Sequence, residues 1–191
     1  MLCKKLIELR TTKPVDKWYI SGKQVEVFWC IFGAAGFVAI HIVSDDMIRK
    51  AELAMIFLLC LCVSAVDFAI RKIPNSLLLA LIVSKIAFLI LNFSTKELKQ
   101  SVLGFAVACV VFTIPSLLKI PVGAGDIKFA AVTGLYLGLY GFLQAMIIMA
   151  IAIGLYGIYI IIRKLGNLKT KTAMGPYLAL GLLLTLVFPI I

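Results

Sequence analysis

Long apolar runs separated by short basic segments are the feature that most constrains this chain. About 20 helical residues cross the hydrocarbon core of a bilayer. Runs near that length occur at about 25–44, 51–70, 76–93, 101–118 and 174–190, and a longer one covers 127–162. Of the 191 residues, 63% are hydrophobic, whereas soluble domains contain roughly 45–50%. The sequence therefore predicts an all-α, polytopic membrane protein.

The longest apolar run is too long for one span, and "GLYLGLYG" near its middle is a plausible break. We expect two helices there, at about 126–139 and 142–162, which gives six to seven transmembrane helices in all. Residues 25–191 are predicted to form a single membrane-embedded domain. The polar segment 1–24 is expected to be cytosolic, either amphipathic on the membrane surface or disordered.

Basic residues in the connections predict the orientation, because Lys and Arg are retained on the cytoplasmic side. With a cytosolic N-terminus, fourteen of the 19 Lys and Arg residues lie inside and four lie outside, while Lys85 falls within an apolar run. The formal net charge of +10 is thus explained by topology, and no nucleic-acid partner is expected. We predict a multi-pass protein of the plasma membrane, with the lipid bilayer as its surroundings.

Two of the nine acidic residues stand apart from the rest. Seven are expected to be solvated or interfacial: Glu8, Asp16, Glu26, Asp45, Asp46, Glu52 and Glu97. Asp67 and Asp126 remain, and the predicted topology places both at cytosolic helix ends. A charge at membrane depth is costly and is a functional candidate by default. Structural roles are also open, since Asp67 could pair with Arg71 and Asp126 could cap its helix.

Two facing aspartates suit peptide hydrolysis, because like charges close together cannot both ionise and so share a proton. The ionised carboxylate takes a proton from water, and the protonated one donates to the scissile carbonyl oxygen. Gly123 and Gly125 are expected to let the backbone leave helical geometry beside Asp126. Lys128 is either a topology anchor or an electrostatic bias on the pair. No metal site or cofactor is predicted, since His and Cys clusters are missing from the sequence.

Three motifs resemble a known family. "GAGDIK" at 123–128 resembles the GxGD signature of intramembrane aspartyl proteases, and "DFAIRKIPN" at 67–75 resembles the element that accompanies it in prepilin peptidases. "MGPYLALG" at 174–181 is similar to an element in that family's last helix, with Tyr177 in place of Phe. The resemblance implies that Asp67 and Asp126 are the catalytic pair. It also implies site-shaping roles for four further residues: Arg71, Asn75, Gly175 and Pro176.

The resemblance further implies a substrate: a prepilin with a basic leader, cleaved on the cytosolic side just before its apolar helix. Large bifunctional members carry two CxxC pairs associated with N-methylation, and this chain has none. It therefore looks like the short, peptidase-only form, without N-methyltransferase activity. Two alternatives stay open: a small ion-coupled transporter that uses Asp67 and Asp126 as cation or proton sites, and a protease of the presenilin group, which pairs GxGD with Pro-Ala-Leu.

Overall fold

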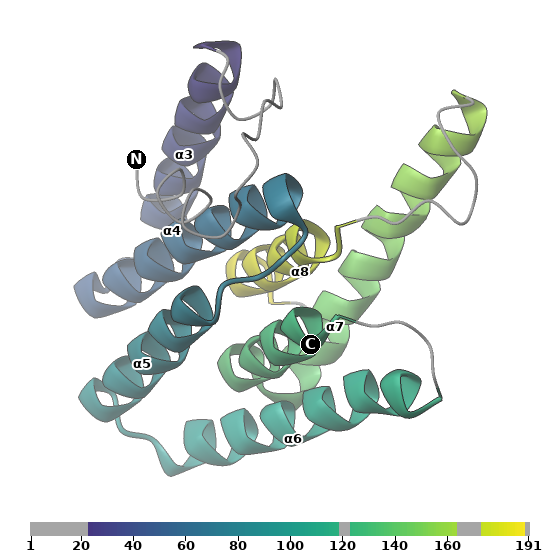
Figure 1. Cartoon of the computed structure of the whole chain (residues 1–191). Coiled ribbons are helices and arrows are strands. Elements are labelled where there is room, and N and C mark those ends of the chain that lie inside the picture. The colour runs from purple at the N-terminus through teal and green to yellow at the C-terminus, as the bar shows by residue number, and fades with distance from the viewer. Residues whose placement is uncertain (1–22, 119–122, 164–172, 190–191) are drawn as a thin grey trace.

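The computed structural model describes residues 23–118, 123–163 and 173–189, and all regular structure within them is helical. In chain order the helices are α3 (Lys23–Val43), α4 (Met47–Ile70), α5 (Asn75–Leu91), α6 (Thr95–Leu117), α7 (Ala124–Ile162) and α8 (Gly175–Val187) (Figure 1). The predicted all-α class is confirmed. The predicted N-terminal segment lies outside the described residues, apart from its last two positions.

Helix α4 is the centre of the N-terminal part of the bundle. It packs against α3, α5 and α8, while α7 packs against α5, α6 and α8. Three of the described helices, α4, α6 and α7, are long and apolar enough to cross a membrane, and α5 and α8 are shorter apolar helices. This arrangement brings the end of α4 and the start of α8 into contact, although the helices are far apart in the sequence.

A sharp bend at Gly138 divides α7 into two segments. Gly138 has φ 70° and ψ −171°, a conformation that side chains with a Cβ rarely adopt. The predicted break in "GLYLGLYG" is therefore confirmed, one residue before the predicted end of the first segment. In Figure 1 the second segment leads away from α6. The first segment approaches α6 so closely that a Cβ at Gly134 would lie 2.2 Å from the Gly104 carbonyl oxygen.

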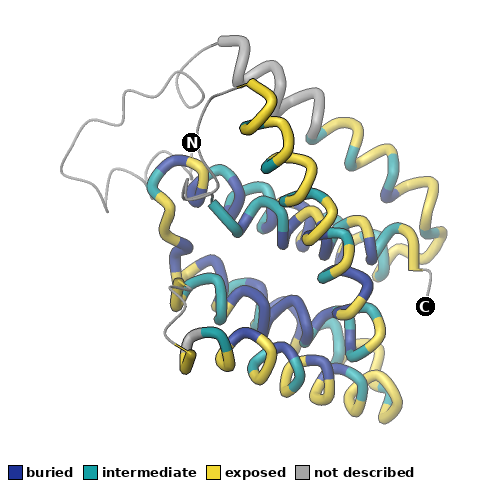
Figure 2. Tube along the Cα trace, turned by 90° about the vertical axis from the view of Figure 1, so that its right-hand side faces the viewer, coloured by how far each residue is buried: buried dark blue, intermediate teal, exposed yellow. Residues whose placement is uncertain are grey.

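Buried residues lie where helices face each other, and exposed residues lie on the outer faces (Figure 2). The largest fully buried apolar side chains include Phe129, Phe142, Ile56, Leu81 and Leu178. Many large apolar side chains on the outside are exposed, including Leu79, Val110 and Ile147. An apolar exterior on apolar helices is what a lipid environment accommodates. The chain is accordingly a membrane protein.

The structure corrects one expectation about the carboxylates. Glu52 was expected to be solvated or interfacial, but it is only 5% exposed. It lies on the inward face of α4 and forms ion pairs with Arg49 and with Lys85, which is also buried. Lys85, which the count of basic residues assigned to neither side of the membrane, is thus a partner of Glu52. Sequence reasoning failed here because α5, which supplies Lys85, covers this face of α4.

Candidate active site

The turn that follows α4 positions Asp67. Asp67 lies in the last turn of α4 and is only 4% exposed. Arg71 ends the helix in the left-handed conformation, with φ 51°, and its backbone N–H donates to the Asp67 carbonyl at 2.8 Å. Ile73 and Pro74 are buried, and α5 begins at the next residue, Asn75. The "DFAIRKIPN" stretch therefore forms a tight, partly buried corner with the Asp67 carboxyl on its inner side.

Asp126 is the third residue of α7 and is half-buried. Gly123 precedes the helix in an extended conformation, and its carbonyl accepts from the backbone N–H of Asp126 at 3.0 Å. The Asp126 carboxyl in turn accepts a hydrogen bond from the Gly123 backbone. Reciprocal bonds of this kind are typical of a capped helix start. They fix the direction of the carboxyl.

Gly125 differs from the prediction. It was expected to let the chain leave helical geometry, but it is the second residue of α7. Its role in the structure is close approach, because a Cβ there would lie 3.2 Å from the Cβ of Ile73. Only Gly123 provides the non-helical position. The small size of Gly125 lets α7 start directly against the corner after α4.

The start of α8 supplies a hydrogen bond to Asp67. The backbone N–H of Gly175 donates to Asp67 Oδ2 at 2.9 Å, across 108 positions of sequence. A Cβ at Gly175 would lie 2.8 Å from that oxygen, so a side chain would displace the carboxyl. Pro176 follows in the first turn of α8, where a missing N–H is tolerated. Sequence reasoning named Gly175 through a resemblance, and nothing in its spacing indicates the contact with Asp67.

The two carboxyl groups lie near one another. The charge of Asp67 is close enough to act on the Asp126 carboxyl. Lys128, the fifth residue of α7, donates to Asn75 Oδ1 at 3.3 Å, which ties the start of α7 to the first residue of α5. The charge of Arg71 also acts on Asp67. However, the ion pairs that the described residues form within 4 Å both involve Glu52, so Asp67 is not held by a close cation.

The arrangement brings most of the predicted residues together. Asp67, Asp126 and three glycines meet where α4 ends and where α7 and α8 begin. Arg71, Asn75 and Lys128 are exposed around them, and Pro176 is partly buried. Within the described part of the chain, no group of three or more His, Cys, Asp and Glu residues could hold a metal ion. Chemically, the site offers two carboxyl groups held by backbone donors.

Comparison with known families gives one match. A model of the type IV leader peptidase family matches residues 54–161, which is more than half of the chain. The matched region contains Asp67 and Asp126 but ends before Gly175 and Pro176. No curated protein and no solved structure matched.

Proposed function

Because the chain belongs to the type IV leader peptidase family, we propose that it is an aspartyl endopeptidase that removes the leader from type IV prepilins, such as Flp-like ones, or from related preproteins. Asp67 and Asp126 are the catalytic pair in this proposal. The family supports a leader-peptidase-type protease. The aspartic mechanism, the residues and the membrane face are our proposal.

The observation that carries the proposal is that two carboxyl groups 59 positions apart in sequence lie close enough for the charge of one to act on the other. Asp67 is buried, accepts from the Gly175 backbone, and acts electrostatically on Asp126. A buried carboxylate in a structural role is normally paired with a cation. Asp67 instead has a backbone donor and a second carboxyl group near it, and the cation that acts on it, Arg71, forms no ion pair with it within 4 Å. That combination suits proton exchange rather than helix packing.

Peptide hydrolysis by such a pair needs one proton shared between the two carboxyl groups. The ionised carboxylate removes a proton from water, and the resulting oxygen attacks the scissile carbonyl carbon. The other carboxyl group gives its proton to the carbonyl oxygen. When the tetrahedral intermediate collapses, the C–N bond breaks and the amine leaves with a proton returned from the pair. The Gly175 and Gly123 backbone groups keep both carboxyl groups aimed at the same substrate bond.

The position of the site at helix ends fits a prepilin substrate. Such a substrate has a basic leader next to an apolar helix, so its scissile bond lies at the boundary between water and lipid. Arg71, Lys72 and Lys128 lie at the same end of the bundle as Asp67 and are exposed. By the positive-inside tendency this end faces the cytosol. A short, peptidase-only member would release an unmethylated pilin N-terminus.

The test is leader removal from a Flp-like prepilin in membranes that contain the full chain. Asp67→Asn and Asp126→Asn are each expected to reduce the cleavage rate at least about 1,000-fold, because each removes one of the two proton-transfer groups. Asp45→Asn is the matched control, since Asp45 is exposed at the other end of α4. Cleavage by either active-site variant at the rate of the control would overturn the proposal. Mass spectrometry of the product with a methyl donor present tests for the absence of methylation.

A further inference from the structure

A polar pocket lies at the end of the bundle opposite to Asp67. Its volume is about 280 Å³, and it lies between the N-terminal end of α4, the C-terminal end of α5 and the start of α6. The residues that line it are Ser44, Asp46, Arg49, Glu52, Lys85, Phe88, Asn92 and Glu97. Glu52 and Asp67 are 15 residues apart on α4, so the pocket lies about 22 Å from the candidate active site. The peptidase proposal does not use it.

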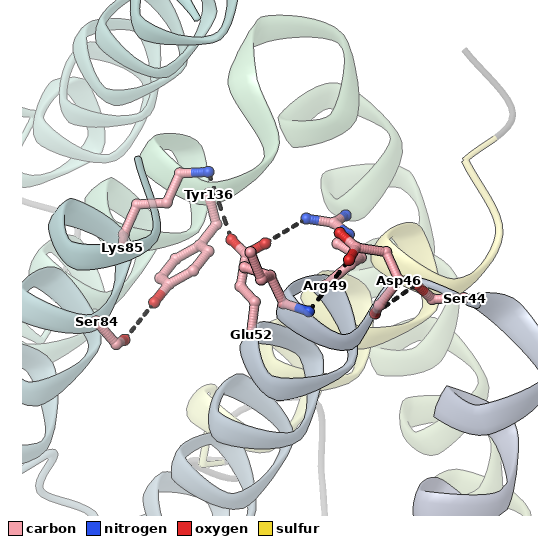
Figure 3. A network of polar contacts seen from close by, with 8 residues as sticks. Ser44, Asp46, Arg49, Glu52, Ser84, Lys85 and Tyr136 are labelled. Atoms are coloured by element: carbon pink, nitrogen blue, oxygen red, sulfur yellow. Dashed lines mark hydrogen bonds and ion pairs between the residues drawn. The ribbon is translucent and has the colours of Figure 1, made fainter. Parts of the chain in front are cut away.

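The inner end of the pocket carries buried charges (Figure 3). Arg49 Nη1 lies 2.6 Å from Glu52 Oε2, and Lys85 Nζ lies 3.7 Å from Glu52 Oε1. The side chains of Glu52 and Lys85 are each only 7% exposed. The ammonium of Lys85 also lies 5.5 Å from the ring centre of Tyr136 on α7. Three helices therefore hold these groups in place.

The ion pair with Glu52 does not use the hydrogen-bonding capacity of Lys85. An ammonium has three N–H donors, and 3.7 Å is longer than an N–H to oxygen hydrogen bond. Glu52 instead makes its short contact with Arg49. Arg49 is one helical turn nearer the surface, and its side chain is 38% exposed. The inner end of the pocket therefore holds a buried ammonium with unused N–H donors, and a second cation lies between it and the surface.

The outer end of the pocket has the opposite sign. Asp46 precedes α4, Glu97 is in the first turn of α6, and both are exposed. Lys85 lies six residues before the end of α5, and Glu52 lies six residues after Asp46, so these two groups are about 9 Å deeper along the helices than the acidic rim, while Arg49 lies about halfway between. Phe88 provides an apolar wall between the two ends. A ligand that fits must carry a negative group on the lipid side and a positive group on the water side.

We propose that this pocket binds a phosphoethanolamine group, with its phosphate at Lys85 and Arg49 and its ammonium at Asp46 and Glu97. In a phosphatidylethanolamine bilayer the phosphate is attached to the glycerol and the ammonium extends toward water, which is the order of charges in the pocket. Phosphate and ammonium groups both form charge-assisted hydrogen bonds with partners of this kind. A phosphatidylcholine headgroup has no N–H to donate, and phosphatidylglycerol has no cation for the acidic rim.

Native mass spectrometry of the full chain, delipidated in detergent, tests the site. Dioleoyl phosphatidylethanolamine is expected to bind at least about tenfold more tightly than the choline and glycerol lipids with the same chains. Glu97→Gln is expected to remove that preference, whereas Lys85→Met is expected to weaken binding of all three lipids at least about tenfold, because all three carry the phosphate. Lys99→Met is the matched control, because Lys99 is an exposed cation near Glu97 on α6 that does not line the pocket.

Glu97→Gln keeps the test decisive if Lys85→Met fails to fold, because Glu97 is exposed. Equal binding of the three lipids, or an unchanged preference in Glu97→Gln, would overturn the proposal. Soluble glycerophosphoethanolamine distinguishes the two sources of the ligand. Displacement of the lipid only at a large excess of this compound supports a lipid site, whereas displacement at equal concentration supports a soluble ligand in the same pocket.

Discussion

Replacing Gly175 by alanine tests how the candidate active site is assembled without removing a carboxyl group. The added Cβ would lie 2.8 Å from Asp67 Oδ2 and 3.1 Å from its Cγ. Contacts under 3.0 Å are not sustained, so either the Asp67 carboxyl or the start of α8 must move. Helix α8 is anchored by buried Leu178 and Leu182, which resist a shift of the backbone. We therefore expect the carboxyl to move and its hydrogen bond from the Gly175 N–H to be lost or lengthened.

The expected size of the effect follows from two magnitudes. A hydrogen bond to a charged group contributes about 1.5–3 kcal/mol, and a displacement of about 1 Å in a catalytic group can reduce the rate about 100-fold. Overpacking costs about 1–3 kcal/mol of stability, which does not unfold most proteins. We expect Gly175→Ala to accumulate in membranes and to cleave prepilin about 100-fold more slowly, with the loss mainly in kcat.

The assay is cleavage of a purified prepilin by the full chain in lipid, with thermal unfolding measured on the same samples. Gly154→Ala is the matched control, because a Cβ at this helical glycine of α7 would meet nothing within 4 Å. The control should cleave at the wild-type rate. The reasoning is refuted if Gly175→Ala and Gly154→Ala cleave equally fast, or if the loss in Gly175→Ala is entirely explained by unfolded protein.

Three further predictions rest on other contacts. Lys128→Met removes the hydrogen bond that ties α7 to α5. Because such a bond contributes about 0.5–1.5 kcal/mol, kcat/KM should fall about 2- to 10-fold. A variant with the wild-type kcat/KM would contradict a role of this bond in holding the site together. Gly138→Ala should lower the unfolding temperature, because φ 70° costs roughly 1–2 kcal/mol for a residue with a Cβ. Gly157→Ala is the control and should leave the unfolding temperature unchanged, because a Cβ there has open space around it. Equal unfolding temperatures of the two variants would argue against strain at the bend. Glu52→Gln should destabilise the fold by about 3–5 kcal/mol, because it leaves Lys85 without its counter-charge. In thermal unfolding, the double variant that also carries Lys85→Met should recover most of the lost stability. No recovery would contradict the pairing of Glu52 with Lys85.

Much of this fold could be predicted because local sequence controls it. Three described helices, α4, α6 and α7, have the length that a bilayer requires, and the ends of α4 and α5 fall within a few residues of the expected limits. The bend at Gly138 could be predicted because a long apolar run with repeated glycines has few other places to change direction. The prediction that Asp67 and Asp126 share one end of the bundle followed from the alternating direction of successive spans. Apart from that common position, which depends on the order of the spans, these features depend on residues close together in the sequence.

The features that sequence reasoning missed depend on contacts between distant helices. The hydrogen bond from Gly175 to Asp67 exists because α8 begins against the last turn of α4, 108 positions away. Glu52 is buried because α5 brings Lys85 over it. Gly125 is helical because α7 starts directly after Gly123, and its lack of a side chain serves the approach to Ile73. Composition and spacing carry no information on which faces of two distant helices meet.

Helix α4 carries two buried carboxylates, and their neighbours distinguish them better than their burial does. Glu52 is 5% exposed and Asp67 is 4% exposed, so burial alone would assign them the same role. Glu52 has two cations within 4 Å, which offset the cost of burying its charge. Asp67 has no ion pair within 4 Å among the described residues; it accepts from the Gly175 N–H, and its charge acts on the Asp126 carboxyl. We therefore expect exchange of the Glu52 and Lys85 charges to be tolerated far better than any change of charge at Asp67.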